Sequence, residues 1–229
     1  MKTVCIIPAR IGSTRLPRKP LLRAGGRTLI RWTYESAMMS YAFHDVVVAT
    51  DSEEIRDEVK SWGGAVMMTS PDHKCGTDRC WEVAKDLKCD IIVNLQGDEP
   101  GIKWHDYRES DVKEFLGEID DGFVATMYDP CSPRIEHVRV SIEWVKGHIE
   151  FARGGTRQHV GIYGFTYDTL GWFASLPQSK REIEQHLEQL RALDNGIPIV
   201  ATEINRYCYA IDTPEDWAEF KAFVEKEQA

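Results

Sequence analysis

Residues 4–20 read VCIIPARIGSTRLPRKP, a short apolar run followed directly by a basic loop. From Arg10 to Arg27 the chain carries six basic residues and no acidic one, although the whole protein has a formal net charge of −9. Glycine and hydroxyl-bearing residues lie between these charges, and their N–H and O–H groups can surround phosphate oxygens that Arg and Lys neutralise. The stretch predicts a triphosphate-binding loop after a first strand; the alternative is a solvated basic surface loop.

The loop differs from two common nucleotide-binding patterns. It lacks the Gly-x-x-x-x-Gly-Lys-Ser/Thr spacing of a P-loop and the Gly-x-Gly-x-x-Gly spacing of a dinucleotide-binding fold. The sequence therefore favours a nucleotide-binding fold of another type.

Strands and helices alternate along the first half of the chain. The pattern predicts strands at 3–7, 45–49, 65–68 and 90–95, with helices at about 28–40, 52–62 and 76–87. Strands that are apolar throughout are typical of a mostly parallel sheet with helices on both faces. Ligands bind at the carboxyl ends of such strands, so the loops after the first and fourth strands are expected to share one crevice.

The second half of the chain has a different pattern. It predicts a small set of antiparallel strands at 138–144, 148–151 and 158–167, with a turn at Lys146 and Gly147. Helices are expected at 168–176 and 180–195, then a strand near 199–203 and a C-terminal helix. The second of these helices ends at Asn195-Gly196 and places apolar residues on one face, namely Ile183, Leu187, Leu190 and Leu193.

Two acidic segments are candidates for metal chemistry. Residues 94–100 read NLQGDEP and end an apolar strand, so the carboxylate of Asp98 faces the expected crevice and suits Mg²⁺, which also binds substrate phosphates. The alternative is a capped turn, because Gly-Asp is common in turns. Residues 211–216 read IDTPED, in which Thr213 or Asp212 is a candidate helix cap with Pro214 in the first turn.

Composition narrows the class of protein. The negative net charge argues against general nucleic-acid binding, and no apolar run approaches the roughly 20 residues that span a bilayer. No signal-peptide pattern opens the sequence, so a cytoplasmic location is expected. The six cysteines include no Cys-x-x-Cys pair, which favours reduced thiols over a zinc cluster; they are Cys5, Cys75, Cys80, Cys89, Cys131 and Cys208.

The first loop, with its form Pro-Ala-Arg-x-x-Ser-Thr-Arg-Leu-Pro-x-Lys-Pro-Leu, resembles the 3-deoxy-manno-octulosonate (Kdo) cytidylyltransferases. The segments QGDEP, HVGIYG at 159–164 and LEQLR at 187–191 are similar to the same family, so the resemblance covers nearly the whole chain. It implies a nucleotide-diphospho-sugar transferase-like α/β fold and the reaction CTP + Kdo → CMP-Kdo + pyrophosphate, which serves lipopolysaccharide or related surface glycans. It also implies a homodimer.

The resemblance divides one domain, residues 1–229, into three parts. The nucleotide half spans about 1–130, a sugar-binding and dimerisation part about 131–200, and a metal segment with the last helix 201–229. It implies that Asp98 and Asp212 hold one or two Mg²⁺ and act in catalysis with Arg10 and Lys19. The implied nucleotide-binding residues are Pro8, Ala9, Arg10, Ser13, Arg15, Lys19, Asp72, Gly76, Thr77, Gln96 and Asp98. The implied sugar-binding residues are Arg15, Gln96, His159, Tyr163, Glu188 and Gln189.

The chain departs from the family pattern at three places. Cys75 stands where the family has serine before Gly-Thr-Asp-Arg, Gln185 stands where a glutamate is expected, and the connection from Arg153 to Gln158 is short. Arg153 and Arg157 are candidates for the sugar carboxylate, and Asp78 with Arg79 for a structural ion pair. The alternatives are a cytidylyltransferase for a modified ulosonic acid such as 8-amino-Kdo, a nucleotidyltransferase for a sugar or alditol phosphate, and a non-catalytic nucleotide-binding subunit.

Overall fold

The computed structural model describes residues 1–13, 15–100, 114–130, 140–145, 148–153, 157–204 and 210–227. The expected turn at 146–147 and the cysteines at 131 and 208 lie outside these ranges, as does most of the short connection after Arg153. No helix among the described residues is long and apolar enough to cross a membrane.

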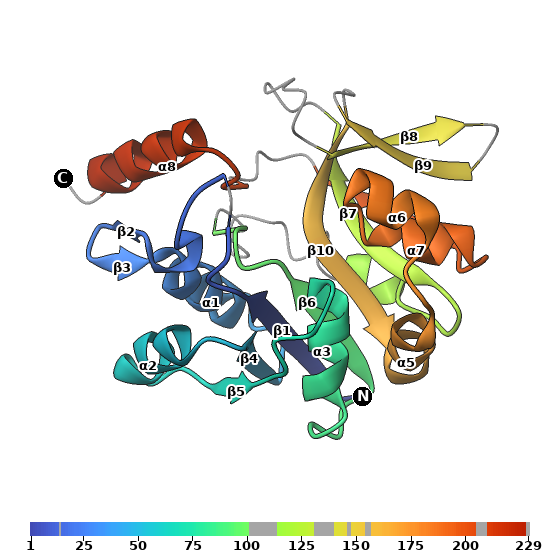
Figure 1. Ribbon diagram of the computed structural model, residues 1–229, viewed down its shortest axis with the longest axis horizontal. Helices are drawn as coiled ribbons and strands as arrows, with labels where there is room; N and C mark the ends of the chain where they lie inside the picture. The colour runs from blue at the N-terminus through green and yellow to red at the C-terminus, as the bar shows by residue number, and fades with distance from the viewer. Residues whose placement is uncertain are drawn as a thin grey trace.

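A single mixed sheet runs through the protein (Figure 1). Its main strands lie in the order β11-β7-β10-β6-β1-β4-β5, and β10 alone on this path runs against its neighbours. The bounds are β1 (Thr3–Ala9), β4 (Asp45–Thr50), β5 (Val66–Met68), β6 (Ile91–Leu95), β7 (Val124–Asp129), β10 (Gln158–Thr166) and β11 (Ile199–Glu203). The prediction of a mostly parallel sheet is confirmed.

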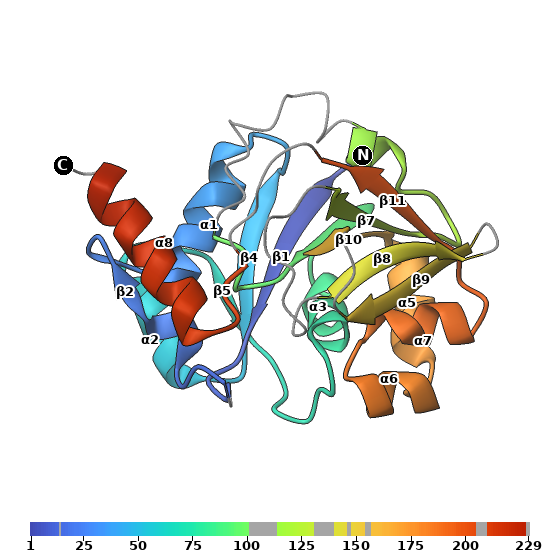
Figure 2. The same ribbon diagram turned by 90° about the horizontal axis from the view of Figure 1, so that it is seen from above.

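Helices cover both faces of this sheet (Figure 2). Successive residues of β1 point to opposite faces, so Cys5 and Ile7 pack with α1 (Leu29–Met39) and α2 (Glu53–Ser61), whereas Val4 and Ile6 pack with the opposite group. That group contains α3 (Gly76–Ala84), α5 (Tyr167–Ser175) and α7 (Gln189–Asp194), and α6 (Lys180–Gln185) packs beside α7. All seven residues of β1 are buried, as expected for a strand covered on both sides.

Short elements after β1 and the last helix of the chain pack together beside the first half of the sheet. The loop after β1 contains the 3-10 turn η1 (Lys19–Leu21) and a small ribbon of β2 (Arg23–Ala24) and β3 (Arg27–Thr28). The C-terminal helix α8 (Pro214–Glu227) packs on this region, where the ring of Phe220 meets Trp32 edge-on at 6.0 Å between ring centroids. The last helix therefore lies against the basic loop although it is about 200 residues later in sequence.

The three antiparallel strands expected in the second half are confirmed as β8 (Val140–Val145), β9 (His148–Arg153) and β10, because β8 pairs antiparallel with both β9 and β10. Three features were not expected. The strand β10 is also inserted in the central sheet between β6 and β7. The strand β7 was not predicted. The helix expected at 180–195 is two short helices, α6 and α7, separated at His186, whose φ of 55° is left-handed.

The two parts of this helix are held by different contacts on either side of the break. Ser179 and Glu182 form a capping box that begins α6, and Leu187 and Leu190 are buried after the break. Ile183, expected on the same apolar face, is 54% exposed instead. The expected stop is confirmed, because Gly196 has a φ of 75° directly after Asn195.

Candidate functional site

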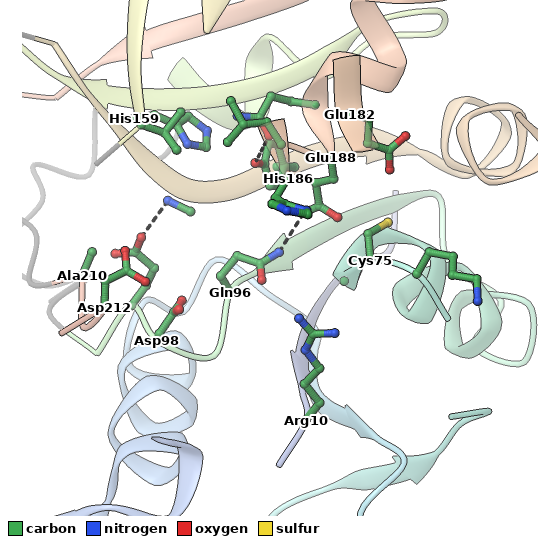
Figure 3. A pocket seen from close by; sticks show the side chains of 18 of the residues that line it. Arg10, Cys75, Gln96, Asp98, His159, Glu182, His186, Glu188, Ala210 and Asp212 are labelled. Carbon is green, nitrogen blue, oxygen red and sulfur yellow. Dashed lines mark hydrogen bonds between the residues drawn. The ribbon is translucent and has the colours of Figure 1, made fainter. Parts of the chain in front are cut away.

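Two adjoining cavities open at the carboxyl ends of β1 and β6, of about 590 Å³ and about 290 Å³. Both are lined by residues from the loops after these strands and from the segment before α8, namely Arg10, Arg15, Gln96, Asp98 and Asp212. The first and fourth predicted strands are β1 and β6, so the prediction that their loops share one crevice is confirmed (Figure 3).

The smaller cavity is built from the basic loop. Pro8, Ala9, Ser13 and Lys19 line it together with Gly12. Arg10 lines both cavities and extends toward the larger one (Figure 3). Among the described residues nothing pairs with its exposed guanidinium, so its charge is available to an anion.

Lys19 lies at the centre of a cluster of charges. Its Nζ is 2.5 Å from Asp98 Oδ2, 3.5 Å from Asp212 Oδ1 and 2.8 Å from the carbonyl oxygen of Ile211. Arg15 donates to the same Asp212 oxygen at 3.1 Å. Burial alone would lower the pKa of Lys19, but the carboxylates of Asp98 and Asp212 outweigh burial and raise that pKa. The two acidic motifs, far apart in sequence, therefore meet around one ammonium group.

The start of α8 fixes the position of Asp212. Thr213 caps the helix through its Oγ1, which accepts from the N–H of Asp216 at 3.2 Å. Asp216 in return accepts from the N–H groups of Asp212 and Thr213, each at 2.9 Å. Thr213 is thus the helix cap, and the side chain of Asp212 is left to face Lys19 and Arg15.

Gln96 and Glu188 join the nucleotide half to the second half across the larger cavity. Gln96 donates to Glu188 Oε1 at 3.1 Å, and the N–H of Thr77 donates to Glu188 Oε2 at 3.1 Å. Burial raises the pKa of the Glu188 carboxyl. A Cβ on Gly76 would lie 2.9 Å from Gln96 Nε2 and 3.1 Å from Pro8 Cγ, so glycine allows α3 to begin this close to the strand ends.

The opposite wall of the larger cavity comes from β10. Its pairing with β7 shifts register between Val160 and Tyr163, which marks a bulge. Residues four apart in an unbroken strand are about 13 Å apart, yet the ring centroids of His159 and Tyr163 are 5.3 Å apart. The bulge therefore brings both rings together on the cavity wall.

Both ring side chains on this wall are buried and neutral. Burial lowers the pKa of His159 to about 3, so its imidazole carries no charge at neutral pH. Burial also raises the pKa of the Tyr163 phenol, whose hydroxyl donates to Gln189 Oε1 at 3.2 Å. The wall therefore offers hydrogen-bonding groups without a positive charge.

Two predicted nucleotide-binding residues lie behind the cavities or away from them. Thr77 is 1% exposed, and its Oγ1 accepts from Asn94 Nδ2 at 2.9 Å, so it supports the wall from behind. Asp72 is exposed in a turn with Ser70 and lines neither cavity. Arg157 also lines neither cavity, and the side chain of Arg153 is outside the description.

Several lining residues had no role assigned from the sequence, among them Lys74 and Glu99. Lys74 is an exposed cation at the rim, one residue before Cys75 in the loop that precedes α3. Glu99 is 4% exposed, and its Oε1 accepts from the N–H of Gly161 at the bulge at 2.8 Å. Glu99 could have been predicted as a site residue from its position in the QGDEP segment. Lys74 could have been predicted from its position beside the Gly-Thr-Asp-Arg run.

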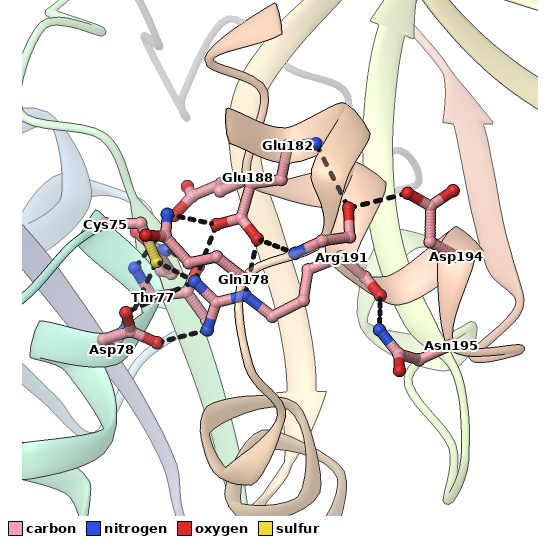
Figure 4. A network of polar contacts seen from close by, with 11 residues as sticks. Cys75, Thr77, Asp78, Gln178, Glu182, Glu188, Arg191, Asp194 and Asn195 are labelled. Carbon is pink, nitrogen blue, oxygen red and sulfur yellow. Dashed lines mark hydrogen bonds and ion pairs between the residues drawn. The ribbon is translucent and has the colours of Figure 1, made fainter. Parts of the chain in front are cut away.

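A buried network behind the cavity involves Cys75 (Figure 4). Arg191 is 1% exposed and pairs with Asp78 and Glu182, each at 2.7 Å. Cys75 Sγ accepts from the N–H of Asp78 at 3.5 Å, so the thiol keeps the capping contact that a serine would make. The expected pair of Asp78 with Arg79 is replaced by two others, because Asp78 pairs with Arg191 and Arg79 lies 3.5 Å from Asp51.

Comparison with known proteins adds independent information. A family profile described as cytidylyltransferase matches residues 4–109. The chain is 37% identical to a 3-deoxy-manno-octulosonate cytidylyltransferase of Escherichia coli, over 100% of this chain and 98% of that protein. It is 36% identical to the protein of the same name from Syntrophotalea carbinolica, over 97% and 98%. A solved CMP:2-keto-3-deoxy-manno-octonic acid synthetase complexed with CTP has a TM-score of 0.86 and 34% identity, covering 99% of this chain and 100% of that chain.

Proposed function

The chain belongs to the 3-deoxy-manno-octulosonate cytidylyltransferases, and from this we propose that it transfers CMP from CTP to the anomeric hydroxyl of Kdo and releases pyrophosphate. The observation that carries the proposal is the meeting of Lys19, Asp98 and Asp212 beside the basic loop. Across the larger cavity lie the neutral hydrogen-bonding groups of β10 and α7. One side suits a triphosphate, and the other suits a polyhydroxylated acid.

The donor set supports a magnesium site at Asp98 and Asp212. Both carboxylates reach the same ammonium group, so they are close enough to share one cation. Mg²⁺ is commonly bound by one or two carboxylates together with substrate phosphates and waters. Among the described residues no group of three or more His, Cys, Asp or Glu could hold a metal ion, so the proposed site relies on the nucleotide phosphates for further ligands.

The reaction depends on positioning and on charge. Arg10 and Lys19 neutralise the β- and γ-phosphates and the charge that develops on the leaving pyrophosphate. Gln96, Tyr163, Glu188 and Gln189 orient the hydroxyls of the sugar acid so that the anomeric oxygen attacks the α-phosphorus in line. Bound Mg²⁺ would supply charge neutralisation at the phosphate and a lower pKa of the attacking hydroxyl.

Pyrophosphate release from CTP and Mg²⁺ tests the proposed function, with Kdo present and then absent. Release that requires Kdo is the expected result. Release with 8-amino-Kdo alone would move the assignment to a modified ulosonic acid. Release with a sugar or alditol phosphate and without any keto-sugar acid would contradict the proposal. Magnesium dependence, homodimer assembly, a role in lipopolysaccharide synthesis and a cytoplasmic location stay predictions.

A further inference from the structure

Thr126 on β7 is a buried residue that touches the bulge of β10 without lining either cavity. It is 0% exposed. Its Oγ1 lies 2.7 Å from the carbonyl oxygen of Ile162 and 2.9 Å from His159 Nε2. The same hydroxyl therefore contacts both the bulge and the ring of a residue on the cavity wall.

The direction of these two hydrogen bonds follows from the hydrogen count. A carbonyl oxygen only accepts, so the single hydroxyl hydrogen of Thr126 is donated to Ile162. The Oγ1 then has lone pairs alone to offer His159, so Nε2 must carry the proton and donate it. The reverse arrangement would place two acceptor oxygens 2.7 Å apart with no hydrogen between them.

The other ring nitrogen of His159 is then an acceptor. In a neutral imidazole with a proton on Nε2, Nδ1 carries only a lone pair. Among the described residues no hydrogen bond to Nδ1 is present. The ring itself is held by an edge-on contact with Phe151 and a tilted contact with Tyr163, both at 5.3 Å between centroids. Its position and its tautomer are therefore both fixed before substrate arrives.

We propose that Thr126 is a positioning residue that holds His159 in the Nε2–H tautomer, so that Nδ1 accepts a hydrogen bond from a hydroxyl of the sugar acid. The part that concerns the sugar rests on the proposed function. It assigns His159 to hydroxyl recognition and excludes it as the cationic partner of the sugar carboxylate. The carboxylate must then meet one of the cations at the cavity, of which Arg10, Arg15 and Lys74 line the larger one.

The first test is the ring tautomer in the full-length, ligand-free protein. Long-range ¹H–¹⁵N spectra are expected to show one histidine with a protonated Nε2 and an unprotonated Nδ1, assigned by its loss in His159→Gln. A ring protonated at Nδ1 would overturn the proposal. This measurement needs neither substrate nor a Thr126 variant, so it decides even if substitution of Thr126 prevents folding or if Kdo proves not to be the substrate.

The second test compares Thr126→Val with Thr126→Ser. Valine keeps the shape and removes the hydroxyl, so the KM for Kdo is expected to rise about fivefold, which corresponds to the loss of one hydrogen bond of about 1 kcal/mol. The KM for CTP is expected to stay within about twofold, because the basic loop is untouched. Serine restores the hydroxyl and is expected to return the KM for Kdo toward that of the natural protein.

Thr202→Val is the matched control. Thr202 lies on the neighbouring strand β11, is 4% exposed, and its Oγ1 has no hydrogen-bond partner among the described residues. This variant removes a buried threonine hydroxyl without contact with His159 and is expected to leave both KM values unchanged. A folded Thr126→Val protein with the tautomer and the KM for Kdo unchanged would contradict the proposal, as would equal increases in both KM values.

Discussion

At the scale of single residues, the positive charge of Lys19 is compensated by neighbouring carboxylates, whereas no described residue compensates that of Arg10. Lys19 is 14% exposed at its side chain and lies between two carboxylates, while Arg10 has no such partner among the described residues. A buried ammonium is stable only where opposite charges offset its lost hydration. Changes at this cluster therefore alter charge more than packing, and the fold of each variant is checked beside its activity.

Asp98→Asn keeps the size of the side chain and removes one carboxylate. We expect kcat to fall on the order of 100-fold or more, because a bound metal contributes several kcal/mol of charge stabilisation in such reactions. Pyrophosphate release measures the loss, and circular dichroism checks the fold. Asp168→Asn, at an exposed position in the first turn of α5, is the control. An Asp98→Asn protein with near-normal turnover would remove this residue from the metal site.

His159 makes stability depend on pH in a defined direction. Its pKa is about 3 in the folded protein and about 6.5 in an unfolded chain. The unfolded state therefore binds the extra proton first, so stability is full above pH 6.5 and decreases as the pH falls from 6.5 toward 3. Between pH 6.5 and 5 the expected loss from this residue is about 2 kcal/mol.

Thermal unfolding at several pH values measures this effect. His159→Gln is expected to flatten the acid side of the curve relative to the natural protein. His186→Asn is the control, since His186 is exposed and asparagine tolerates its left-handed backbone. An acid limb of the same slope in His159→Gln would show that other groups cause it.

At the scale of elements, the bulge of β10 determines the shape of the sugar-side wall. A Cβ on Gly161 would lie 2.7 Å from Glu99 Oε1 and 3.1 Å from Gln96 Cβ. Both neighbours line the larger cavity. Both also hold the bulge in place, because Glu99 Oε1 accepts from the Gly161 N–H and the Gln96 N–H donates to the Gly161 carbonyl, each at 2.8 Å. The bulge therefore tolerates no side chain without moving the site.

Gly161→Ala is expected to destabilise the protein by about 1–3 kcal/mol through overpacking and to raise the KM for Kdo more than the KM for CTP. Urea unfolding and steady-state kinetics measure the two effects. Gly117→Ala is a matched control, because a Cβ there meets nothing within 4 Å. Equal effects of the two substitutions would contradict the role given to the bulge.

The elements also show where prediction from sequence ends. The parallel strands of the first half were found because each is a continuous apolar run, and Lys19, Asp98 and Asp212 were singled out by motifs that the fold does bring together. β7 was missed because its sequence, VATMYD, is neither a continuous apolar run nor a strict alternation, since the polar residues Thr126 and Asp129 are buried with the rest of the strand. The break at His186 was missed because no glycine or proline marks it. Thr126 could not be found, since its importance depends on a register shift in another strand.

At the scale of the whole molecule, the order of the sheet joins the two halves of the chain. β6 and β7 are consecutive main strands in sequence but are not neighbours, because β10 lies between them. Residues 91–95 pair with residues 162–166, and residues 124–129 pair with both β10 and β11. The nucleotide half and the sugar-side wall are thus parts of one hydrogen-bonded layer.

A fragment of residues 1–130 is therefore expected not to fold cooperatively. Without β10 it exposes the edge of β6, whose five residues are all buried in the complete chain. Urea unfolding followed by circular dichroism and by fluorescence tests this, with the full chain as reference. Coincident sigmoidal transitions for the fragment would show that the nucleotide half is an independent folding unit.

The insertion of β10 also has a consequence for synthesis on the ribosome. The chain emerges from its N-terminus, so β1, β4, β5 and β6 are available long before residues 158–166 leave the exit tunnel. During that interval one edge of the nascent sheet carries unpaired backbone groups and an apolar surface, which is the condition that favours aggregation. The central sheet is completed only after about two-thirds of the chain has been made. Slow translation between β6 and β10 would therefore lengthen the period in which the nascent chain is prone to aggregate.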